Sequence, residues 1–178
     1  KQINRRGPRP LGDITARPLG IQEAVQHFQR GAVLLDTRSK EEFKRKHIPG
    51  AVHLEADDQL SNRVGFVLPP DAPIILQVTD EADYRQVVYS LARVAYDQVV
   101  GYLADSLQAW ESFGLPTTSG DVRDIEPMEL SDLLENGNGD RPVVIDVRES
   151  WEYSSGHVPG ARLISLGEFA QHVDDLDP

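Results

Sequence analysis

The chain alternates short apolar runs with segments whose apolar residues recur at helical spacing. The runs that predict strands buried on both faces are residues 32–35, 74–78 and 98–102. The segments with apolar residues three and four positions apart are 19–30, 84–95 and 106–113. This alternation predicts an α/β fold, in which a mostly parallel sheet is covered by helices on both faces.

Start and stop signals support these elements. Ser39 and Glu42 have the spacing of a capping box and predict a short helix after the first strand. Asp80 is placed to cap the helix that contains residues 84–95, and Gly31 stands where a helix C-cap is expected. Residues 55–65 are polar and predict an irregular segment.

One pattern, Asp-x-Arg-x-x-x-Glu-aromatic-x-x-x-His-[Ile/Val]-Pro-Gly-Ala, occurs twice, at an offset of 110 residues and with identical internal spacing. Its fixed positions in the first copy are Asp36, Arg38, Glu42, His47, Pro49 and Gly50. In the second copy they are Asp146, Arg148, Glu152, His157, Pro159 and Gly160. Two copies without a gap indicate an internal duplication.

This pattern resembles the first signature of rhodanese-like domains, and Ala109-Trp110 followed by Gly114-Leu115-Pro116 resembles the family's closing pattern. The resemblance implies two rhodanese-like three-layer domains in tandem. It also implies that the Asp, Arg and Glu form a buried network behind the active-site loop. The ion pairs would then be Arg38–Glu42 and Arg148–Glu152, and the His-x-Pro-Gly turn would be structural.

Three parts follow from this organisation. Residues 1–18 are rich in Pro, Gly and charge and are expected to be a linker. Residues 19–118 are expected to form a rhodanese-like domain without its catalytic Cys. Residues 122–178 are expected to form the N-terminal half of a second such domain.

The family transfers sulfur as a cysteine persulfide, on a Cys that begins the loop after the central strand. This chain has no cysteine, and Val78 stands at or beside that position. The residues of the degenerate loop are Val78, Thr79, Asp80, Glu81, Ala82, Asp83, Tyr84 and Arg85. Three carboxylates here would repel a thiosulfate or persulfide anion, so we expect no catalytic residue in this domain and a structural or interaction role instead. An unrelated activity of the acidic loop is the open alternative.

The second copy poses a different question. The same distance from Asp146 places its loop near position 188, after Pro178. The alternative function is therefore part of a sulfurtransferase whose active Cys lies beyond Pro178. A half-domain should also expose an open strand edge and apolar surface, which further chain, the first domain or a second copy could cover, so a homodimer is possible.

Charge and hydropathy limit the kinds of partner and the cellular location that are expected. The net charge is −11, of which residues 1–18 carry +4 and the rest −15. An acidic body argues against nucleic acid or an anionic membrane as a partner. No apolar run approaches the length of a membrane span and no signal peptide is recognised, so we expect a cytoplasmic protein.

Other chemistries have weak support. His47, His53, Asp57 and Asp58 lack the spacing of metal ligands, so no metal or other cofactor is expected in this chain. A phosphatase of related fold would also need a loop Cys. The expected partners are other domains of the same polypeptide.

Residues 66–76, 91–97 and 101–103 are similar to the degenerate unit of one fusion family. Its members join a metallo-β-lactamase-fold domain to two rhodanese-like units. The resemblance implies sulfur metabolism, with an upstream hydrolase or persulfide dioxygenase and a downstream sulfurtransferase.

Overall fold

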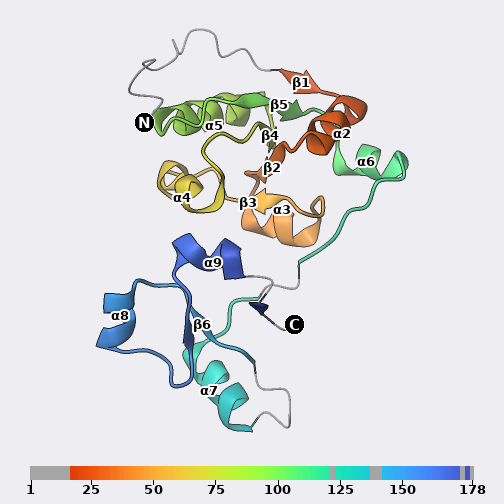
Figure 1. Cartoon of the computed structure of the whole chain (residues 1–178). Helices are drawn as coiled ribbons and strands as arrows, with labels where there is room; N and C mark the ends of the chain where they lie inside the picture. The colour runs from red at the N-terminus through yellow and green to blue at the C-terminus, as the bar shows by residue number, and fades with distance from the viewer. Residues whose placement is uncertain (1–16, 121–122, 137–141, 173–174, 177–178) are drawn as a thin grey trace. The chain divides into compact units, whose positions relative to one another are not determined.

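The computed structural model describes residues 17–120, 123–136, 142–172 and 175–176 (Figure 1). The predicted linker therefore lies, up to residue 16, outside the described residues. The chain divides into two compact units, residues 1–121 and 122–178. They are called the first unit and the second unit below, and each is described by itself.

The first unit contains a parallel five-stranded sheet in the order β1-β5-β4-β2-β3. Its strands are β1 (Pro18–Leu19), β2 (Val33–Asp36), β3 (Val52–His53), β4 (Ile74–Gln77) and β5 (Val99–Leu103). The central strand, β4, is buried along its whole length. This confirms the predicted α/β fold and the prediction of a central parallel strand in this region.

Helices cover both faces of this sheet (Figure 1). They are α2 (Ile21–Gln29), α3 (Lys40–Arg45), α4 (Leu60–Val67), α5 (Glu81–Arg93) and α6 (Leu107–Ser112). Side chains of α4 and α5 pack with Leu35 and Leu76 on one face. Side chains of α2 and α6 pack with Leu34 and Ile75 on the other. Successive residues of a buried strand thus serve two separate cores.

The predicted caps form. The hydroxyl of Ser39 and the carboxylate of Glu42 make the reciprocal bonds of a capping box at the start of α3. The Asp80 carboxylate accepts from the amide of Asp83 at 2.9 Å at the start of α5. Gly31 has a φ of +89° just after α2, a conformation that glycine adopts without strain.

The prediction of an irregular segment over residues 55–65 is wrong, because α4 begins at Leu60. Leu60 and Val64 are one helical turn apart and both are buried. Val67 is partly buried against the same core, so the inward positions of α4 do recur at helical spacing, and the polar residues 61–63 between them obscure this spacing in the sequence.

Pro18, assigned to the linker, belongs to an edge strand. β1 pairs with β5 in register Pro18–Tyr102 and Leu19–Leu103. Gly101 has a φ of +157°, and a Cβ there would lie 2.5 Å from the carbonyl oxygen of Arg17. The close approach of β1 therefore requires glycine at this position of β5. Proline is tolerated at the edge of a sheet.

The second unit contains α7 (Pro127–Asn136), β6 (Ile145–Asp146), α8 (Ser150–Ser155), β7 (Arg162–Leu163) and α9 (Leu166–His172). Among its described residues, β6 and β7 form a two-stranded parallel sheet. The buried apolar residues among those described in this unit are Ala161 and Ile164. Its strand–helix–turn–strand order repeats that of β2, α3 and β3.

None of the described helices is long and apolar enough to cross a membrane.

Candidate functional site

The signature of the first unit is built around a buried carboxylate at the end of β2. Asp36 Oδ1 accepts from the amide of Arg38 at 3.1 Å and from its Nε at 2.9 Å. Arg38 Nη2 lies 2.5 Å from Asp36 Oδ2 and also donates to the carbonyl of Lys46 at 3.0 Å. The guanidinium thus ties the end of the strand to the end of α3.

The expected ion pairs Arg38–Glu42 and Arg148–Glu152 are corrected by this geometry. Each arginine binds the aspartate two residues before it. Glu42 instead accepts from the hydroxyl of Ser39 at 2.8 Å, and this bond, with the charges of Arg38 and Arg45, lowers the pKa of Glu42. The glutamate therefore stabilises the start of the helix, and the arginine stabilises the end of the strand.

The second copy repeats this arrangement almost atom for atom. Asp146 Oδ1 accepts from the amide of Arg148 at 3.1 Å and from its Nε at 2.9 Å. Arg148 Nη2 donates to the carbonyl of Gly156 at 2.9 Å, and its bonds to Asp146 lower the pKa of that carboxyl. This arginine-to-carbonyl bond was not predicted from the sequence. In the structure it occurs in both copies, between residues eight positions apart.

The His-x-Pro-Gly residues make a tight turn in each copy. His47 Nδ1 lies 2.8 Å from the carbonyl of Phe43, and the two rings stack at 3.8 Å. His157 and Tyr153 do the same at 2.9 Å and 3.7 Å. Since a carbonyl only accepts, Nδ1 carries the proton in both. Pro49 and Pro159 precede the positive-φ glycines, Gly50 and Gly160.

Most residues of the predicted degenerate loop belong to helix α5. Val78 is buried in the core at the end of β4, and only Thr79 and Asp80 precede α5. The carboxylate of Asp80 accepts a hydrogen bond from the amide of Asp83, and the backbone carbonyl of Asp80 accepts one from the amide of Tyr84 at 3.1 Å. The start of α5 therefore satisfies two of its amides with Asp80 itself.

The other residues of this segment have ordinary helix contacts. Glu81 pairs with Arg85 at 2.8 Å on the surface, where Ala82 is also exposed. Tyr84 is buried with its ring 5.0 Å from that of Tyr102, and burial raises its pKa. None of these side chains is a thiol, and the exposed carboxylates oppose binding of a second anion.

The residues considered for a metal have other contacts. His47 and His53 both stack on Phe43, and His53 Nε2 lies 2.9 Å from the carbonyl of Arg38. Asp57 pairs with Arg63 near the start of α4. Within the described part of the chain, no three His, Asp or Glu side chains gather as a metal site would need.

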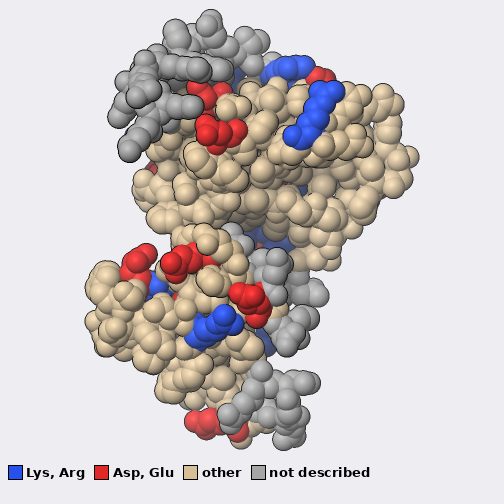
Figure 2. All heavy atoms as spheres, in the orientation of Figure 1, with Lys and Arg blue, Asp and Glu red and all other residues tan. Residues whose placement is uncertain are grey.

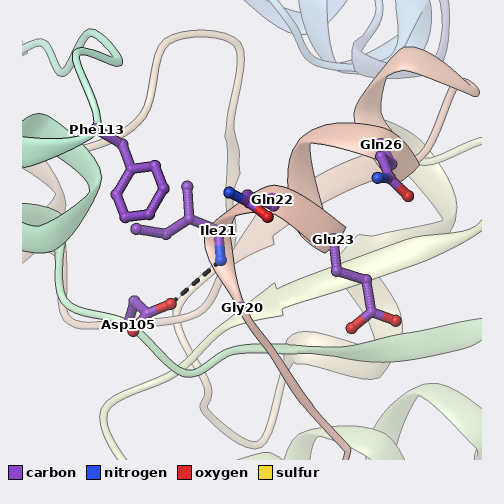
Figure 3. Close-up of a pocket in the computed structure, with 7 residues that line it drawn as sticks. All are labelled: Gly20, Ile21, Gln22, Glu23, Gln26, Asp105 and Phe113. Carbon is purple, nitrogen blue, oxygen red and sulfur yellow. Dashed lines mark hydrogen bonds between the residues drawn. The ribbon is translucent and has the colours of Figure 1, made fainter.

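A shallow pocket at the start of α2 was not predicted (Figure 3). Asp105 Oδ2 accepts from the amide of Ile21 at 3.2 Å and so caps a helix whose own N-cap, Gly20, has no side chain. Glu23 and Asp105 both line the pocket, which disfavours an anionic ligand. Such a cap joins residues far apart in the sequence, so no local signal could reveal it.

On the face shown in Figure 2, Lys and Arg side chains of each unit lie in small groups, some of them beside Asp or Glu, and most of the described surface drawn is uncharged. This face therefore offers no continuous basic surface of the kind that holds a polyanion.

Comparison with known proteins identifies the family. Residues 21–113 and 126–178, most of the chain, match the description "Rhodanese-like domain". An uncharacterized protein of Buchnera aphidicola is 29% identical over 91 residues, which cover 51% of this chain and 60% of that protein. The tRNA sulfurtransferase of Desulfurococcus amylolyticus is 37% identical over 60 residues, which cover 34% of this chain and 11% of that protein.

The chain thus spans less than two thirds of either relative. Among solved structures, that of EanB, a persulfide form with ergothioneine, has a TM-score of 0.51 at 20% identity and covers 84% of this chain and 41% of its own. This likeness concerns the fold. The duplicated signature, the parallel sheet and the matched segments agree, and the chain belongs to the rhodanese-like domain family.

Proposed function

We propose that residues 19–118 are a non-catalytic rhodanese-like domain with a structural or interaction role in a protein of sulfur metabolism. The observation that carries this proposal is the junction between β4 and α5. Two residues, Thr79 and Asp80, separate the buried Val78 from the helix. A loop that wraps a sulfur atom and directs several amides at it cannot be built from two residues.

The chemistry of the junction supports the same proposal. The thiolate is the nucleophile in sulfur transfer, and the chain contains no cysteine. Asp80 supplies its own negative charge to the first turn of α5, where a bound anion would otherwise be stabilised. By contrast, the sheet and both cores are intact, so the fold remains available for contacts with other domains.

A thiosulfate:cyanide sulfurtransferase assay tests the proposal. The 178-residue chain should produce thiocyanate no faster than buffer, at any thiosulfate concentration. Turnover that persists after repurification would show a sulfur acceptor other than a thiol and would reject the proposal.

The finer identity of the parent protein is also a proposal. The similarity of residues 66–76 and 91–97 to a degenerate fusion unit supports an upstream metallo-β-lactamase-fold hydrolase or persulfide dioxygenase, which would be the partner domain. Reading the gene upstream of Lys1 tests this. An open reading frame that encodes a His- and Asp-rich metal motif supports the fusion, and an unrelated sequence or a start codon there rejects it.

The second candidate is a sulfurtransferase whose active Cys lies beyond Pro178. Two observations favour it: the second unit keeps the complete signature, and one relative is named a tRNA sulfurtransferase. Reading the gene downstream of Pro178 decides. A Cys near position 188, at the offset set by Val78 in the first unit, supports this candidate. Its absence leaves the non-catalytic proposal.

A further inference from the structure

The chain remains bound to the first unit after the end of α6. Residues 115–120, called the strap below, run from α6 past α3 (Figure 1). Leu115 packs against the core of α2 and α6, and the indole of Trp110 donates to the carbonyl of Pro116 at 3.1 Å. Trp110 is 4% exposed, so the strap starts from a fixed point in the core.

The strap then pairs with the signature turn through its main chain. The amide of Thr118 donates to the carbonyl of His47, and the amide of His47 donates to the carbonyl of Thr118, both at 2.8 Å. The amide of Gly120 donates at 3.0 Å to the carbonyl of Lys44, in the last turn of α3. Carbonyls in the last turn of a helix have no partner within that helix, so the strap satisfies one that α3 leaves open.

Side-chain contacts add to these main-chain bonds. The carboxylate of Glu111, near the end of α6, accepts from Thr117 Oγ1 at 2.5 Å and from Lys46 Nζ at 3.0 Å. These two partners lower the pKa of Glu111, so the carboxylate is ionised at neutral pH. Because the ion pair is exposed, it contributes little energy, but it joins α6, the strap and the end of α3.

The strap has the composition of a flexible linker, yet it is bonded along its length. Residues 117–120 are Thr-Thr-Ser-Gly, which are small and polar. Three main-chain hydrogen bonds hold these residues to the first unit. A Cβ at Gly120 would lie 3.8 Å from His47 Cε1, and the division between the two units falls directly after residue 121. The chain therefore leaves the first unit at the signature turn, beside His47.

We propose that the strap is an anchor, which fixes the point where the chain leaves the first unit and keeps the tether to the second unit short. This inference rests on the proposed structural role and makes it specific: the signature turn holds the strap. Extended chain spans about 3.4 Å per residue, so release of residues 115–120 would lengthen the tether by up to about 20 Å.

Amide hydrogen exchange of the 178-residue chain tests whether the strap is bound. The amides of His47, Thr118 and Gly120 should exchange at least about a hundredfold more slowly than in an unstructured peptide. Thr118→Pro removes the amide that donates to His47, and should bring the exchange of Gly120 to within about tenfold of the peptide rate. Thr118→Ala keeps every main-chain bond of the strap and is the matched control, so its exchange should equal that of the wild type.

The length of the tether has its own test. The chain has no cysteine, so Phe66→Cys with Met128→Cys places one spin label on each unit. Both native side chains are exposed, at 53% and 76%. Double electron–electron resonance then measures the distribution of distances between the two labels. Thr118→Pro should widen this distribution by roughly 10 Å or more, within the added reach of about 20 Å, whereas Thr118→Ala should leave it unchanged.

Exchange of the Thr118 and Gly120 amides at the peptide rate in the wild type overturns the inference, as does a distance distribution that Thr118→Pro leaves unchanged. Protection of the β4 amides shows that a variant is folded. Gly120→Pro removes only the bond to Lys44, so it replaces Thr118→Pro where that variant does not fold, and it too must widen the distribution. The thiosulfate assay does not depend on the strap, so the two proposals fail separately.

Discussion

The two copies of the signature have the same local geometry in very different surroundings. The side chains of Asp36 and Arg38 are 1% and 11% exposed, whereas those of Asp146 and Arg148 are 10% and 44% exposed. The arginine-to-carbonyl distances nevertheless differ by only 0.1 Å, at 3.0 Å and 2.9 Å. The motif is therefore encoded within the strand–helix–turn segment itself.

Burial of the motif depends on the rest of the unit. In the first unit β4 covers one side of β2 and helices cover both faces of the sheet. In the second unit the described residues extend β6 on one side alone. The short signature sequence specifies the geometry of the motif. A complete sheet adds desolvation, so the same hydrogen bonds and ion pair contribute more to stability.

The largest expected contrast is between the two aspartates. Asp36→Asn leaves the guanidinium of Arg38 buried without its charge partner, and should lower the free energy of unfolding of the first unit by about 3 kcal/mol. Asp146→Asn should cost clearly less, because solvent screens Arg148. Urea denaturation of both variants measures this. Equal losses would show that burial does not separate the copies.

The next effect concerns the closed edge of the first unit. Gly101→Ala places a Cβ 2.5 Å from the carbonyl oxygen of Arg17 and 2.8 Å from Leu19 Cγ. It should separate β1 from β5 and cost about 2 kcal/mol of unfolding free energy. Gly65→Ala is the matched control, since it lies in α4 with open space around it, and should stabilise by about 1 kcal/mol. A neutral Gly101→Ala would contradict the close approach of β1.

The helix caps give a smaller, reciprocal contrast. Ser39→Ala removes the hydroxyl that accepts from the amide of Glu42, and should cost about 1 kcal/mol. Glu149 holds the equivalent position in the second unit, so Glu149→Ser should stabilise α8 by a similar small amount. Urea midpoints of the two variants should move in opposite directions, and a shift of both in one direction would contradict the pairing of these positions.

The smallest expected effect is a pH dependence at Glu42. The hydroxyl of Ser39 lowers the pKa of this carboxyl below its ordinary value of 4.5. A lowered folded-state pKa means that the stabilisation is full above 4.5 and is lost as the pH falls through the folded value. Ser39→Ala should therefore reduce the stability that is lost as the pH falls from 4.5 through the folded-state pKa of Glu42. A parallel urea titration of the wild type and the variant checks this.

Much of the first unit could be predicted from its sequence because its signals are local. The apolar run of β4, the Asp80 cap and the Ser39–Glu42 box each lie within a few residues. α4 was missed because the polar residues around Leu60 and Val64 were taken as irregular, although Val67 continues their helical spacing.

The predictions that failed concern features that depend on contacts between distant residues or on backbone geometry, which composition does not show. β1 has two residues, Pro18, predicted as linker, and Leu19, predicted as the start of a helix, and it is fixed by β5, more than eighty residues away. The pairing of Arg38 with Asp36 follows from the turn of the chain at the end of β2, which brings residues two apart together. Likewise, the Asp105 cap joins α2 to the β5–α6 connection.

The most direct test of the central claim, that the first unit has lost the site and not only its cysteine, is Val78→Cys in the thiosulfate:cyanide assay. The new thiol should stay buried with a raised pKa, two residues before the Asp80-capped α5, and should transfer no sulfur. Thiol titration before and after unfolding shows that it is present and enclosed. Thiocyanate formation by this variant above the wild-type level would contradict the account.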